Sequence, residues 1–110
     1  MLIQLIAIFS VHFIADFLLQ TRWMGENKSH SHKALLAHIG VYTACLSVFG
    51  WQYALINGSI HMVVDFFSSR ASSYFYKKKQ MHYFWAVIGA DQLLHNVTLL
   101  ITWNMLLLVK

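Results

Sequence analysis

The chain has 110 residues, of which 58% are hydrophobic and 11% are charged, and it contains no proline. That length suits a single domain, residues 1–110, but soluble domains usually have about 25% charged residues and about 45–50% apolar ones. The composition therefore disfavours an ordinary soluble globule and favours a small membrane protein. The net charge of +4 does not indicate nucleic-acid binding, because the basic residues lie in loops between apolar segments. Cys45 is the only cysteine, which excludes an intrachain disulfide and a cysteine-rich zinc site.

Four apolar segments predict an all-α fold, a bundle of four transmembrane helices at about residues 1–20, 33–50, 53–70 and 82–109. A 20-residue helix rises about 30 Å, which matches the hydrocarbon thickness of a bilayer. The segment 1–20 lacks a basic start and a small-residue cleavage site, so we expect a retained helix rather than a signal peptide. Ser31 is a plausible N-cap for the second helix.

Basic residues set the expected topology. Nearly all of them lie in the segments 21–33 and 70–79, which face the same side if four helices cross the membrane. The positive-inside rule makes that side cytoplasmic and places both termini outside.

Three histidine–aspartate pairs share one spacing inside apolar segments: His12 with Asp16, His61 with Asp65, and Asp91 with His95. Residues four apart lie on one face of a helix, one turn from each other. An ionisable group in an apolar segment is costly unless it has a partner or a function. With the predicted topology, these pairs and His38 of the second helix all fall in the inner half of the bilayer. We therefore expect one convergent site near the cytoplasmic face.

Histidine nitrogen and carboxylate oxygen are ligands for divalent metal ions, and helical bundles build one-metal and two-metal sites from them. Zinc is favoured here, with manganese and iron as alternatives. The predicted metal ligands are His12, Asp16, His38, His61, Asp65, Asp91 and His95. Asp16, Asp65 and Asp91 are also the predicted catalytic carboxylates, and Gln20, Lys28 and Gln92 are the predicted substrate-binding residues.

The motif His12-x3-Asp16-Phe17-x2-Gln20, followed by Lys28, His38, His61-x3-Asp65 and Asp91-Gln92-x2-His95, resembles a family of small bacterial and phage membrane proteins. That family is catalogued as a domain of unknown function, and the resemblance covers nearly the whole chain. It implies a multi-span protein of the bacterial inner membrane and brings no settled activity. A looser similarity, to membrane-embedded metal-dependent hydrolases, is an analogy only.

The preferred function is a metal-dependent hydrolase that acts on a lipid-linked or membrane-proximal substrate, with water held by the metal as nucleophile. One alternative is a transporter or channel for metal ions or protons that uses the same residues. Another is a non-enzymatic membrane module in which the His/Asp network is structural. The expected partners are the lipid bilayer, a lipid-linked substrate and a second copy of the chain in a homodimer.

Overall fold

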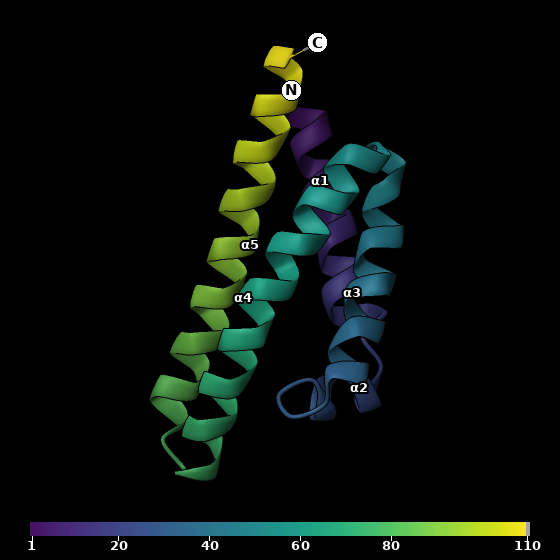
Figure 1. The fold of residues 1–110 in the computed structure, drawn as a ribbon. Coiled ribbons are helices and arrows are strands. Elements are labelled where there is room, and N and C mark those ends of the chain that lie inside the picture. The colour runs from purple at the N-terminus through teal and green to yellow at the C-terminus, as the bar shows by residue number, and fades with distance from the viewer. Residues whose placement is uncertain (110) are drawn as a thin grey trace.

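Four long helices pack side by side in the computed structural model, which describes residues 1–109 (Figure 1). The elements are α1 (Leu2–Phe13), the π-helix η1 (Ile14–Leu18), α2 (Arg22–Asn27), α3 (His32–Leu46), the 3-10 helix η2 (Ser47–Phe49), α4 (Trp51–Lys77) and α5 (Met81–Val109). Helices α4 and α5 form a long antiparallel hairpin, α3 packs against α4 and α1, and α1 also contacts α5. The N-terminus and the end of α5 lie at the same end of the bundle, opposite α2.

Local sequence explains where the helices begin and turn. The hydroxyl oxygen of Thr21 accepts a hydrogen bond from the Met24 amide at the start of α2, and Ser31 caps α3 in the same way through the Ala34 amide. Gly50, with φ of 118°, makes the turn into α4 in a conformation that side chains disfavour. The expected N-cap at Ser31 is thus confirmed.

The apolar core occupies the half of the bundle nearest the termini. It consists of Ile8, Ala15, Tyr42, Leu46, Tyr53, Ala54 and Leu99, with Phe49 and Trp103 against it. The Tyr53 hydroxyl donates a hydrogen bond of 2.9 Å to the Leu99 carbonyl, which ties α4 to α5. The middle of the bundle is occupied by polar side chains instead.

The prediction of four transmembrane helices is wrong. Within residues 1–109, only α5 is both long and apolar enough to cross a membrane. Helix α3 has 15 residues and so rises about 22 Å, less than a bilayer core of about 30 Å. Helix α4 is long, but it carries Asn57, His61, Asp65 and Arg70 and does not qualify as apolar. The expected multi-pass topology is therefore not supported, and the segment expected to be a basic loop is helical as far as Lys77.

Gly58 allows α3 and α4 to approach each other closely. A Cβ atom at this position would lie only 2.1 Å from the Thr43 hydroxyl oxygen and 3.2 Å from its Cβ. A Cβ atom added at Gly40, on α3, would lie in open space. The two glycines therefore make a matched pair for testing this packing.

We expect Gly58→Ala to lower the free energy of unfolding by about 1–3 kcal/mol, because the added methyl group forces the two helices apart. Gly40→Ala should instead raise it by up to about 1 kcal/mol through better helix propensity. Equilibrium denaturation of both variants measures the difference. Equal stability of the two variants would contradict this packing of α3 on α4.

Candidate functional site

Every long helix contributes ionisable side chains to one buried group in the middle of the bundle. The group consists of His12, Asp16, His38, His61, Asp65, Asp91 and His95, each at most 8% exposed. It contains all three aspartates of the chain. The remaining acidic residue, Glu26, pairs with Arg22 on the exposed surface of α2. Such a concentration of buried charge requires mutual pairing or a bound cation.

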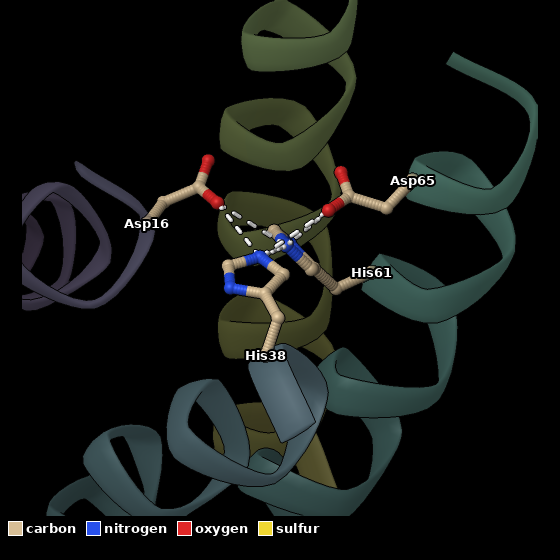
Figure 2. A group of neighbouring side chains, drawn as sticks. All are labelled: Asp16, His38, His61 and Asp65. Carbon is tan, nitrogen blue, oxygen red and sulfur yellow. Dashed lines mark hydrogen bonds and ion pairs between the residues drawn. The ribbon is translucent and has the colours of Figure 1, made fainter. Parts of the chain in front are cut away.

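Four ligand atoms of this group converge on one point, from η1, α3 and α4 (Figure 2). The Nε2 atoms of His38 and His61 lie 3.0 Å apart. Asp16 Oδ1 lies 3.1 Å from His38 Nε2 and 3.4 Å from His61 Nε2. Asp65 Oδ2 lies 3.2 Å and 3.4 Å from the same two nitrogens.

Five of the six separations among these four atoms are close to those of a tetrahedral metal site, and the sixth, between the two carboxylate oxygens, is within 4.8 Å. Zinc bonds of about 2.0–2.1 Å to nitrogen and oxygen place neighbouring ligand atoms of a tetrahedron about 3.3 Å apart. The five measured separations run from 3.0 to 3.4 Å. The group therefore has the ligand types, number and spacing to hold one divalent metal ion.

Unsatisfied polar atoms give a second indication of a cation. Asp16 Oδ1 is buried and, although it lies 3.1 Å from His38 Nε2, it accepts no well-aligned hydrogen bond from the described residues. The lone pairs of two unprotonated Nε2 atoms only 3.0 Å apart repel each other, unless a proton or a metal ion lies between them. Buried polar groups rarely remain unsatisfied, so both observations fit a metal ion at this point.

The electrostatics keep the carboxylates ionised, as metal ligands must be. Burial acts to raise the pKa of Asp65, but hydrogen bonds with His38, His61 and His95 outweigh it and hold the pKa well below its usual range. Burial lowers the pKa of His38, whereas its contacts with Asp16 and Asp65 raise it, and the net pKa is above the ordinary value. Metal binding at this group therefore displaces a proton from His38.

A second group of possible ligands adjoins the first and shares Asp16 with it. It consists of Asp16, Asp91 and His95. His95 Nε2 lies 3.1 Å from Asp91 Oδ1 and 3.2 Å from Asp65 Oδ1, so Asp65 also faces both groups. Shared carboxylates of this kind are typical of two-metal sites in helical bundles. The arrangement can therefore accommodate one ion or two.

Aromatic stacking holds the ring of His61 in place. It lies between Tyr42 and His95, each with ring centroids 3.8 Å away and rings tilted by only 20° and 23°. Metal-bound histidines are usually oriented by a hydrogen bond from their second nitrogen. Here His61 Nδ1 has no such partner among residues 1–109, and the stack fixes the ring instead.

His12 lies beside the two ligand groups rather than within them. Its Nδ1 lies 2.9 Å from the Tyr42 hydroxyl and its Nε2 lies 2.9 Å from Gln92 Oε1. The Gln92 amide nitrogen donates to Asp16 Oδ2 and to Asp91 Oδ2, at 2.7 and 3.0 Å. His12 and Gln92 thus orient the carboxylates that face the candidate metal positions.

The π-helix η1 presents Asp16 to the group. The Leu19 amide donates to the Ile14 carbonyl, five residues back, which is the hydrogen bond that defines a π turn. The wider turn leaves His12 Nε2 3.9 Å from Asp16 Oδ2, so this pair does not bond directly despite its spacing. Single π turns recur at functional sites, and this one lies at the shared ligand.

A pocket of about 240 Å³ leads from the surface to this polar group. Its lining includes Asp16 and Asp91 of the polar group together with Gln20, Lys28 and Gln92. The Lys28 ammonium donates to Gln20 Oε1 at 2.9 Å and to Asp65 Oδ2 at 3.0 Å. All three predicted substrate-binding residues therefore line one pocket that reaches the candidate ligands.

Sequence reasoning missed two parts of the site. Tyr42 resembled an ordinary core aromatic within an apolar helix, and nothing in its neighbours indicated the contact with His12. Ser68, Ser69 and Ser72 also line the pocket. Their spacing from His61 and Asp65 continues the same face of α4, and this periodicity is the signal that could have found them.

The fold and the site define an all-α protein with a buried His/Asp group that can hold a metal ion. The chain belongs to the DUF3307 family, described as proteins of unknown function, which matches residues 3–110. The resemblance to a domain of unknown function is thus confirmed. No curated protein and no solved structure matches the chain.

Proposed function

We propose that the protein is a metal-dependent hydrolase. The supporting observation is the convergence of four ligand atoms, from His38, His61, Asp16 and Asp65, next to an open pocket that Asp16 lines. Water that reaches the ion from this pocket would be an additional ligand. A divalent metal ion at such a site supplies Lewis acidity and lowers the pKa of water. Zinc is the favoured ion because two imidazoles and two carboxylates suit it, with manganese and iron as alternatives.

The residues around the ligands have separate roles in this proposal. Asp91 lines the pocket and is accessible from it, so it is the carboxylate best placed to accept a proton from water. Ser68 Oγ donates to Asp91 Oδ1, and Gln92 donates to Asp91 Oδ2, which fixes the orientation of this carboxylate. Asp16 and Asp65 act as ligands, and His12 positions Gln92.

The direct test is hydrolysis by zinc-loaded protein and by the same protein after dialysis against a chelator. Substrates of three classes, a phosphate ester, a carboxylic ester and an amide, cover the reactions that such sites catalyse. Activity with one class, lost on chelation and restored by zinc, supports the proposal. Zinc bound at full stoichiometry with no turnover of any class overturns it.

We further propose that the protein acts at a lipid bilayer. Helix α5 has the length and hydropathy to cross one, and large apolar side chains are exposed along α1, α4 and α5. Among them are Leu2, Ile3, Leu55, Val63, Phe67, Leu93, Leu94 and Ile101, each at least 50% exposed. Exposed apolar surface of this extent marks a membrane or protein contact. The basic residues 77–79 at the α4–α5 turn suit anionic head groups.

Flotation tests the bilayer proposal. Purified protein is mixed with phosphatidylcholine vesicles containing anionic phosphatidylglycerol and centrifuged through a sucrose gradient. We expect the protein to float with the vesicles and to remain bound in high salt, because apolar contact dominates. A detergent-free homodimer that stays at the bottom of the gradient would show that a second copy covers this surface.

A further inference from the structure

The outer part of the pocket has a composition distinct from that of the metal ligands. Its polar lining comprises Gln20, Lys28, Ser68, Ser69 and Ser72, and its apolar lining includes Phe17, Phe84, Val87 and Ile88. The lining thus combines polar groups with apolar side chains, close to the candidate ligands Asp16 and Asp91. Such a combination suits a substrate with a charged end and an apolar end.

Ser69 gives the clearest indication that this pocket binds a ligand. It is only 7% exposed, it lines the pocket, and its hydroxyl has no hydrogen-bond partner among residues 1–109. It lies one helical turn beyond Asp65 on the same face of α4. A buried hydroxyl without a partner costs stability, so its position beside the pocket indicates a bound group that completes its hydrogen bonding.

Lys28 gives the lining of the pocket a positive charge. Its ammonium uses two donors on Gln20 and Asp65, and an ammonium has three. Two divalent ions and Lys28 together exceed the three aspartate charges by two positive charges. With two divalent ions bound, the site therefore attracts a doubly negative group.

We propose that Lys28 and Ser69 bind the phosphoryl group of a phosphate ester and hold it against the metal site. The apolar side chains that line the pocket contact the organic part of the ester. This inference rests on the proposed metal-dependent hydrolysis. In the reaction, water adds to phosphorus, the bond to the ester oxygen breaks, and the proton lost by water passes to the departing alcohol. The products are an alcohol and inorganic phosphate.

The test measures binding of inorganic phosphate to zinc-loaded protein by calorimetry, with zinc content determined on each sample. We expect the dissociation constant to rise about tenfold or more in Lys28→Gln, and several-fold in Ser69→Ala. Ser69→Ala is the cleaner variant, because the Ser69 hydroxyl makes no hydrogen bond with residues 1–109 that the substitution would remove. Lys33→Gln, an exposed lysine outside the pocket, should bind phosphate like the wild type.

The outcomes separate this inference from the proposed function. Zinc-loaded, active protein whose phosphate affinity is unchanged in Lys28→Gln and Ser69→Ala overturns the phosphoryl site alone. Phosphate binding that depends on both residues in a protein without metal overturns the hydrolase and keeps the site. If neither zinc nor phosphate binds, both proposals fail.

The source of the phosphoryl group is decided by two substrates. One is p-nitrophenyl phosphate in solution, and the other is phosphatidic acid in phosphatidylcholine vesicles. Release of phosphate from the vesicles alone identifies a lipid phosphate, and release from the soluble ester alone identifies a water-soluble one. Release from neither, by a zinc-loaded protein that hydrolyses another ester class, overturns the inference.

Discussion

In an Asp65→Asn variant, we expect zinc affinity to fall at least about 100-fold and hydrolysis to be lost with it. Asp65 Oδ2 lies within 3.4 Å of His38 Nε2 and His61 Nε2, and Asp65 Oδ1 faces His95. The substitution removes one negative charge from both ligand groups at almost constant volume. Losing a ligand costs more than losing an orienting partner, and the latter alone typically costs about 10–100-fold in affinity.

Glu26→Gln is the matched control, because Glu26 is the one carboxylate outside the site. This variant should bind zinc and turn over substrate like the wild type. Calorimetric titration with zinc measures affinity, and circular dichroism establishes that each variant is helical. A folded Asp65→Asn protein with wild-type zinc affinity would show that Asp65 is not a ligand.

Removing the metal should lower the melting temperature by about 15 °C or more. A ligand present at about 1,000 times its dissociation constant stabilises a protein by about 4 kcal/mol, and each kcal/mol shifts the melting point of a domain of this size by roughly 4 °C or more. The effect is large because the metal-free core holds three carboxylates, and Lys28 is the only lysine or arginine among residues 1–109 that forms an ion pair with them.

Thermal unfolding in zinc and in chelator measures this shift, and added zinc should reverse it. Magnesium should not, because it prefers oxygen ligands and avoids imidazole. Asp65→Asn should melt at the same temperature in zinc and in chelator, whereas Glu26→Gln should behave like the wild type. A wild-type melting point that does not respond to zinc would mean that the His/Asp group stabilises the bundle without metal.

The i,i+4 spacing of three His/Asp pairs indicates which residues matter, because helical periodicity alone places each pair on one face. The partners of these residues are set by tertiary packing, which no local pattern contains. The two histidine nitrogens that lie closest together, the Nε2 atoms of His38 and His61, belong to different helices. Gln92 links Asp16 to Asp91 across the bundle, and the π turn in η1 separates His12 from Asp16.

The transmembrane prediction failed for a related reason. Apolar content does not measure bilayer contact in this chain, because helix length and the polar residues of α4 exclude three of the four predicted spans. The apolar residues of α1 and α3 in part form a core around Tyr42 and Leu46. Composition therefore distinguishes this chain from an ordinary soluble domain, but it does not determine which helices contact a membrane.

The most direct measurement is the metal content of the protein purified under mild conditions, by mass spectrometry, with Asp65→Asn and Glu26→Gln purified in parallel. The two ligand groups that share Asp16 predict one or two equivalents of zinc, manganese or iron in the wild type and in Glu26→Gln, and less than about a tenth of that in Asp65→Asn. Folded wild-type protein that contains no metal, and takes up none when zinc is added, would contradict the metal site.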